Sequence, residues 1–394
     1  MQLTAVLANQ MKISHFQSMR SLKQIIIGTT YRKVLKPVLF AQDPEKIHNR
    51  FIFIGHIMGK FRITRFINRL LFKYKNTMLE QTVFDIKFEN PVGLSAGFDK
   101  DAQIIRILPE VGFGFMQVGS ITFKPYQGNQ RPRLYRLKKS QGIIVNYGLK
   151  NNGAKKIVKN LPRKPKHFLV SASVAKTNSR DTITTKDGIE DYAECLKILQ
   201  KSKYFDFFTI NISCPNAFGG EPFAEPKKLD RLLKKIHTLG IDKPIFLKMP
   251  INEKWSNSKL LIEVAIKNKI DGLIIGNLDK NRSNPQIKDQ IPKHIKGGIS
   301  GKPTWSITNE LISKTYKNYG DKIKIIGVGG IFSAQDAYEK IKRGATLVQL
   351  ITGMIFEGPQ LIGEINRGLV ELLKKDGYTN ISDAIGANHS KHLG

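Results

Sequence analysis

The chain has 394 residues, of which 41% are hydrophobic and 24% charged, a composition typical of a globular protein and not of a disordered or fibrous one. Its formal net charge of +32 leaves three interpretations open: binding to nucleic acid, attraction to an anionic membrane surface, and a lysine-rich bias without a function. The two cysteines, Cys195 and Cys214, exclude a disulfide framework and a cysteine-rich metal site, and they suit a reducing compartment.

Residues 1–78 are expected to form a helical extension without a secretory signal. The apolar stretch at 25–27 is too short for a signal sequence, and no small-residue cleavage site accompanies it. Asp43 and Pro44 are typical of an N-cap and a first helical position, so a helix is expected to begin there. At 51–72, large apolar residues alternate with lysine and arginine. This pattern excludes a spanning helix and favours an amphipathic one, which lies on a membrane, packs on the main domain, or does both.

Residues 79–394 are expected to begin with a short hairpin at 81–90 and to continue as eight repeats of an apolar strand and a helix. Nearly continuous apolar strands that alternate with helices indicate a parallel sheet covered by helices, and eight such units predict a (β/α)8 TIM barrel. Strands are expected at 91–96, 114–121, 168–175, 205–212, 244–249, 271–277, 323–328 and 346–351. Helices are expected near 101–110, 149–160, 187–200, 226–239, 257–268, 303–318, 334–342 and 358–374.

Polar residues follow the ends of the predicted strands, which is where such barrels carry their chemistry. The run FDFFTINISCPNAFGG at 205–220 ends in a turn that holds Cys214. The Cys214 thiol is a candidate base or nucleophile, with a small buried hydrophobe as the alternative, whereas Cys195 lies in a predicted helix and is expected in the core. Lys100 and Lys248 follow strands, where a lysine is costly unless it meets an anion, so both are candidate site residues.

Glycines follow the last two predicted strands. GVGG at 327–330 precedes a predicted helix, and Thr352 and Gly353 follow the eighth strand. Barrel enzymes commonly bind a phosphate with backbone N–H groups at these two loops. Together, the two motifs favour a phosphorylated cofactor.

Five segments resemble the dihydroorotate dehydrogenases, the FMN-dependent barrels of pyrimidine biosynthesis. In matching order they are NPVGLSAGFDKDA at 90–102, GNQRPRLYRL at 128–137, NISCPN at 211–216, GGISGKP at 297–303 and IIGVGGIFSAQDA at 325–337. The resemblance implies oxidation of dihydroorotate to orotate, with Cys214 as the base that takes a proton from C5 while C6 passes a hydride to the flavin. It implies that the substrate is bound by Lys100, Asn146, Asn216 and Asn277. It implies that FMN is held by Ala96, Gly97, Ser120, Asn211, Lys248, Gly301, Gly329, Gly330, Thr352 and Gly353. No metal is implied.

Three positions depart from the family's pattern. Cys214 is usual in the soluble class, which uses fumarate or NAD, whereas the quinone-linked class typically has serine there. Asn146 stands one place nearer the glycine of its loop than usual, with Val145 in the expected position. Gly276 replaces a hydroxyl residue before Asn277, which removes a possible flavin contact.

The sequence therefore gives two conflicting indications of the electron acceptor. The extension, including YRKVLKPVLFAQDPEKIH at 31–48, resembles that of the quinone-linked class. We expect a quinone, because an added helical subdomain distinguishes a class better than one exchangeable base does. We also expect peripheral association with the cytoplasmic side of the membrane, and no nucleic-acid partner. The alternatives are a soluble acceptor, an RNA-modifying barrel similar to the tRNA-dihydrouridine synthases, and a non-enzymatic binding protein on a degenerate barrel.

Overall fold

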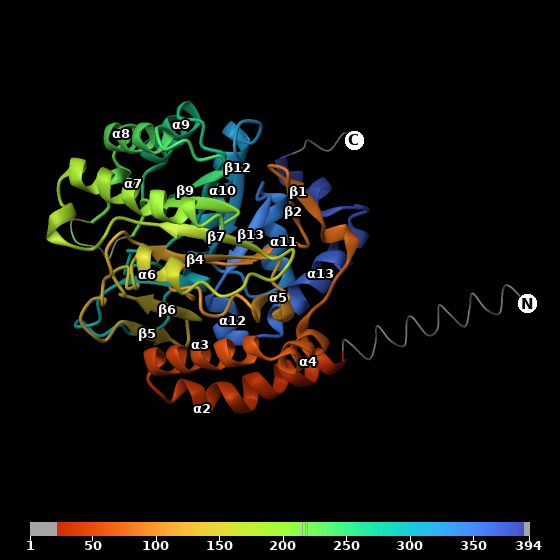
Figure 1. Ribbon diagram of the computed structural model, residues 1–394. Helices are drawn as coiled ribbons and strands as arrows, with labels where there is room; N and C mark the ends of the chain where they lie inside the picture. Colours follow the sequence, from red (N-terminus) through yellow and green to blue (C-terminus); the bar gives the residue numbers. More distant parts are fainter. Residues whose placement is uncertain (1–21, 215, 217, 219, 390–394) are drawn as a thin grey trace, which may run out of the picture.

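A closed barrel of eight parallel strands lies at the centre of the computed structural model, which describes residues 22–214, 216, 218 and 220–389 (Figure 1). Each strand falls within the range that its apolar run predicted, so the (β/α)8 TIM barrel is confirmed. The strands are β3 (Val92–Leu94), β4 (Phe115–Ile121), β7 (Leu169–Val174), β8 (Phe207–Asn211), β9 (Ile245–Met249), β10 (Gly272–Ile275), β12 (Lys324–Val328) and β13 (Leu347–Leu350).

Helices cover the outside of the barrel. They are α5 (Leu108–Val111), α6 (Ala154–Lys159), α7 (Thr185–Lys201), α8 (Pro226–His237), α9 (Trp255–Lys267), α10 (Trp305–Tyr319), α11 (Ala334–Lys342), α12 (Thr352–Glu357) and α13 (Leu361–Lys375). The helix expected near 101–110 is wrong over 101–107, which form bends and turns. The buried carboxylate of Asp99 accepts hydrogen bonds from the backbone N–H groups of Gln103 and Ile104 there, each at 2.9 Å, and so holds the chain in a turn.

One end of the barrel is closed by aromatic side chains. Phe115 and Phe207 stand at the starts of β4 and β8, and both rings pack against Phe88. Phe88 belongs to the expected hairpin, which is confirmed as β1 (Gln81–Val83) and β2 (Ile86–Phe88). Because the N-terminal end of the strands is filled in this way, the C-terminal end is the one available for a site.

A small antiparallel sheet lies beyond the C-terminal ends of the strands. It consists of β5 (Leu134–Leu137), β6 (Gly142–Val145) and β11 (Gly298–Gly301), with β6 in the middle. From the sequence, no strand is expected within 122–145 or 278–302, so this sheet is an addition that the structure makes. The pairing joins segments about 150 residues apart, and a local pattern cannot report it, least of all in the glycine-rich β11.

The N-terminal helices lie together beside α5, α12 and the small sheet (Figure 1). Residues 22–30 are helical and lead into a π-helical turn (Tyr31–Leu35), α2 (Lys36–Phe40), α3 (Pro44–Lys60) and α4 (Arg62–Phe72). As expected, Asp43 caps α3, accepting a hydrogen bond from the Lys46 N–H at 2.8 Å. Extended backbone at Phe61 divides the amphipathic segment at 51–72 between α3 and α4. None of the helices in the described ranges is long and apolar enough to cross a bilayer.

Specific contacts attach this helical segment to the barrel. Arg69 of α4 donates two hydrogen bonds to the carboxylate of Glu110 on α5, at 2.7 and 2.8 Å. The buried carboxylate of Glu45, in the first turn of α3, is paired with Arg133 at 3.1 Å. The Tyr31 hydroxyl donates to the Ile355 carbonyl of α12 at 2.7 Å. Charge pairing and hydrogen bonds therefore fix the helices, while much of their apolar surface stays exposed.

Candidate active site

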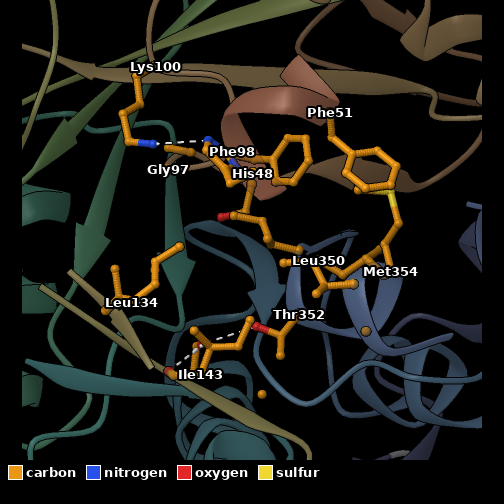
Figure 2. Close-up of a pocket in the computed structure, with 18 of the residues that line it drawn as sticks. His48, Phe51, Gly97, Phe98, Lys100, Leu134, Ile143, Leu350, Thr352 and Met354 are labelled. Carbon is orange, nitrogen blue, oxygen red and sulfur yellow. Dashed lines mark hydrogen bonds between the residues drawn. The ribbon is translucent and has the colours of Figure 1, made fainter. Parts of the chain in front are cut away.

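A cavity of about 530 Å³ runs from the C-terminal ends of the barrel strands to the N-terminal helices. Figure 2 shows both parts of its wall: Gly97 and Lys100 follow β3 and Thr352 begins α12, whereas His48 and Phe51 come from α3. The barrel part carries ammonium, amide, hydroxyl and thiol groups. The helical part is apolar, and its lining includes Leu39, Phe40, Ile47, Phe51, Ile54 and Met58.

The residues expected to hold FMN all line this cavity. They are Ala96, Gly97, Ser120, Asn211, Lys248, Gly301, Gly329, Gly330, Thr352 and Gly353. Of the residues expected to meet the substrate, Lys100, Cys214, Asn216 and Asn277 also line it. Asn146 does not belong to this wall, and Val145 does. The fold thus gathers these predicted residues from all parts of the barrel, while their individual roles stay predictions.

The loop after β12 suits a phosphate. Gly329 and Gly330 have φ angles of +104° and +71°, and a side chain at either position would collide with the start of α10 at Thr304 or Trp305. Only glycine backbone fits this turn, so the chain can approach a ligand closely there. This cradle, together with the buried ammonium of Lys248 and the amide of Asn211, fits a phosphorylated flavin.

Gly276, which departs from the family pattern, has a structural reason. Its φ is +140°, and a Cβ added there would collide with the backbone of Val328 on the neighbouring strand. A residue with a hydroxyl side chain would need β10 or β12 to move. The flavin contact expected from such a hydroxyl is therefore absent from this position.

Cys214 and Cys195 have different surroundings. Cys214 lies half-buried on the cavity wall, within electrostatic reach of the buried lysines Lys176 and Lys248. Positive charge nearby favours a thiolate. Cys195 is fully buried on α7, which confirms its expected place in the core, and burial raises the pKa of its thiol well above the usual value. Only Cys214 has the surroundings of a reactive thiol.

Lys100 lies between the two parts of the cavity. Its Nζ is 3.4 Å from Nε2 of His48 on α3 and 3.8 Å from the centre of the Tyr147 ring (Figure 2). Burial, followed by repulsion from Lys150, lowers the pKa of Lys100 to about 8. Burial and then the Lys100 charge lower the pKa of His48 well below its ordinary value. At neutral pH the imidazole is therefore uncharged and can accept a hydrogen bond from the lysine.

Amide side chains hold the loop that carries Cys214. Asn216 donates to the Val145 carbonyl at 2.8 Å, and Asn129 donates to the Asn216 carbonyl at 3.0 Å. Asn129 also donates to Oδ1 of Asn146 at 3.1 Å, so the Asn146 amide is engaged with Asn129. Asn277 donates to the Ser213 hydroxyl next to the cysteine. Three loops from different parts of the chain thus meet at this point.

Several residues of this site carried no prediction from the sequence. His48 and Tyr147 sit in segments that the resemblance covered, but nothing in their spacing pointed to Lys100. Neither Asn129 nor Lys176 was predicted as a site residue. His48 stands among the polar residues Lys46, Asn49 and Arg50, so no local sequence signal marked it as a site residue.

Comparisons with known proteins agree with this geometry. A family model described as "Dihydroorotate dehydrogenase" matches residues 78–373. A relative named dihydroorotate dehydrogenase (quinone), from Nautilia profundicola, is 35% identical, over 92% of this chain and 99% of its own. One of the same name from Christiangramia forsetii is 36% identical, over 86% of this chain and 99% of its own. A crystal structure of DHODH in complex with ferulenol, from Eimeria tenella, is similar at a TM-score of 0.79 and 26% identity, covering 89% of this chain and 96% of that one.

Proposed function

This chain belongs to the dihydroorotate dehydrogenase family, and on that premise we propose how its cavity divides the work of the reaction. The enzyme oxidises dihydroorotate to orotate, uses FMN, and has a quinone as its electron acceptor. The expectation of a quinone is confirmed by relatives that this chain matches over nearly their whole length, and the soluble-acceptor and RNA-modifying alternatives are set aside. The observation that carries the proposal is the cavity, which joins a polar set of side chains to an apolar one.

The polar end is proposed to bind dihydroorotate. Lys100 supplies a positive charge for the substrate carboxylate, and the amides of Asn216 and Asn277 match the amide groups of the pyrimidine ring. Asn146 is proposed to act on the substrate indirectly, because its side-chain oxygen accepts a hydrogen bond from Asn129. Cys214 takes the proton from C5 of the substrate, and the nearby Lys176 and Lys248 stabilise its thiolate.

The flavin site is proposed to use the barrel loops. The backbone at Gly329, Gly330 and Gly353 would hold the phosphate, and Lys248, Asn211 and Ser120 would contact the ring system. Bound FMN would supply the acceptor for the hydride from C6 of the substrate and the route by which electrons reach the quinone. Asn211 donates to the Ser120 hydroxyl at 2.8 Å, so these two donors are already fixed in position.

The helical segment is proposed to be a quinone-access and membrane-contact unit comprising residues 1–78, with residues 79–394 as the catalytic domain. Phe51 and Ile54 line the cavity and are also 42% and 49% exposed, so the apolar wall continues to the surface. Exposed large apolar side chains concentrate on this segment: Leu22, Ile25, Ile26, Val34, Leu35, Val38, Phe51, Phe53, Ile54, Phe61, Ile63, Phe66, Ile67, Leu70 and Leu71. Elsewhere in the described ranges, such residues number only Ile183, Phe218 and Leu260.

This surface fits peripheral contact with the cytoplasmic side of a membrane. Its apolar side chains are interleaved with Lys60, Arg62 and Arg65, which can meet anionic headgroups. Part of the net charge of +32 then has a purpose at the bilayer surface.

The reaction is tested in two half-reactions. Anaerobic flavin-loaded protein is mixed with dihydroorotate and then, in separate syringes, with a short-chain ubiquinone, menaquinone, fumarate or NAD. We expect rapid loss of flavin absorbance, followed by rapid reoxidation by a quinone alone. If dihydroorotate does not bleach the flavin, the proposed substrate is wrong. If fumarate or NAD reoxidises the flavin as rapidly as a quinone does, the proposed role of the helical segment in quinone access is wrong.

A further inference from the structure

Lys340 is a buried cation that the proposed reaction does not use. It lies on α11, its side chain is 0% exposed, and its Nζ donates to Oγ1 of Thr308 and Oδ1 of Asn309 on α10, each at 2.8 Å. Both acceptors are neutral. Among the residues that the structure describes, no carboxylate forms an ion pair with it; Asp336, the nearest in electrostatic influence, is paired with Lys302 at 3.2 Å.

The position of Lys340 is unfavourable for a charge in the protein alone. Burial lowers the pKa of its ammonium to about 7, against the weaker opposing influence of Asp336. Hydrogen bonds to a hydroxyl and an amide satisfy the donors but do not neutralise the charge. A negative group close by would offset that desolvation.

The glycine cradle lies directly beyond Thr308. A Cβ added to Gly327 would be 3.3 Å from Cδ of Lys340, and one added to Gly329 would be 3.2 Å from the Thr308 hydroxyl that the lysine contacts. One threonine side chain therefore separates the ammonium from Gly329. Gly329 and Gly330 line the cavity, whereas Lys340 does not. The lysine is behind the cradle, out of contact with anything in the cavity.

We propose that Lys340 is the buried countercharge for the phosphate of FMN, acting across Thr308 and the Gly329–Gly330 turn. The inference rests on the proposed placement of the FMN phosphate in this cradle. A charge shielded from water interacts strongly with another over several ångströms, so direct contact is not required. Lys340 is thus a positioning residue, which makes the cradle electropositive while the backbone provides the hydrogen bonds.

The competing interpretation is that Lys340 only ties α11 to α10. Riboflavin separates the two, because it has the ring system of FMN without the phosphate. If Lys340 is a countercharge, its loss weakens the binding of FMN more than that of riboflavin. If Lys340 only holds the two helices together, its loss affects the binding of both flavins equally.

The test uses the full-length protein and the variant Lys340→Gln, which removes the charge and keeps a side-chain amide able to bond to α10. Dissociation constants for FMN and riboflavin are measured from flavin fluorescence, with riboflavin also measured by displacement of FMN. We expect the Kd for FMN to rise about tenfold to fiftyfold while the Kd for riboflavin changes less than about twofold. Lys342→Gln, on the same helix, removes an equal charge that is paired with Asp376 at the surface, and it should leave both constants unchanged.

The inference is overturned if Lys340→Gln weakens the binding of both flavins equally, or if it weakens the binding of neither. If Lys340→Gln does not fold, Lys340→Met provides the second test. This variant keeps the apolar stem of the side chain and removes the charge, and it must weaken FMN more than riboflavin. Failure of the wild-type protein to bind FMN at all would instead refute the proposed function, so the two failures are distinguishable.

Discussion

The two ends of the cavity are built on different principles. At the polar end, single side chains have specific partners: Asn277 donates to Ser213, Asn216 to the Val145 carbonyl, and Lys100 rests against His48. At the apolar end, α2 and α3 present several side chains that make non-directional contacts. Removing one polar group from a directional site should abolish a specific contact. Shortening one side chain of an apolar surface should weaken binding only in proportion to the contact area removed. The difference predicts large effects of substitutions at one end and small ones at the other.

The largest effect is expected at Cys214. Cys214→Ala removes the proposed base, so the rate of flavin reduction by dihydroorotate should fall about 10³-fold, as measured by anaerobic stopped-flow absorbance. Reoxidation of the reduced flavin by quinone should not change. Cys195→Ala is the matched control, because that buried thiol lies away from the cavity lining, and it should keep the wild-type rate. Similar rates for the Cys214 variant and the wild type would show that another group takes the proton.

Lys100 comes next. Lys100→Met keeps the stem of the side chain and removes the charge, so the KM for dihydroorotate should rise about 30-fold to 100-fold. The KM for quinone should stay within about twofold, since the acceptor is uncharged. Lys156→Met, on α6 and exposed, is the control for loss of one positive charge. A rise in the KM for quinone as large as that for dihydroorotate would mean that the two ends are not separate.

The pH dependence sharpens the same comparison. Lys100 is charged below its lowered pKa of about 8 and neutral above it, so substrate binding should be retained at low pH and lost as pH rises through 8. Above that value, kcat/KM for dihydroorotate should fall roughly tenfold per pH unit as Lys100 loses its charge. His48, whose pKa is lowered well below neutrality, adds no transition between pH 7 and 9. The alkaline fall should disappear in Lys100→Met; its persistence there would assign it to another group.

The smallest effects are expected on α3. Phe51→Ala should raise the KM for quinone about twofold to fivefold without changing flavin reduction, because it removes part of the cavity wall. Phe53→Ala, at a residue that is 66% exposed and outside the lining, should leave that KM unchanged and weaken binding to anionic vesicles. Sedimentation with vesicles and steady-state assays with a short-chain quinone measure the two effects. Identical behaviour of the two variants would contradict separate quinone and membrane surfaces.

Local patterns correctly predicted much of this molecule. The eight barrel strands follow from apolar runs of strand length, and the start of α3 follows from Asp43 and Pro44. The helix expected at 101–107 failed because one buried carboxylate, Asp99, competes for the backbone N–H groups that a helix would use. The residues grouped around the cavity could be named because each stands at a strand end, and parallel strands bring those ends to one face.

The sequence by itself determined the barrel, its catalytic face and the identity of most side chains there, since these depend on periodicity and on motifs within a few residues. The tertiary structure alone decided which side chains meet across long distances. It placed His48 of α3 against Lys100, directed Asn146 to Asn129, and brought Lys340 behind Gly329. It also paired β11 with β6 across about 150 residues. Such contacts depend on how separate elements pack against one another. A local pattern shows which residues are apolar, but hydrophobic attraction is non-directional, so the pattern does not show which elements will meet.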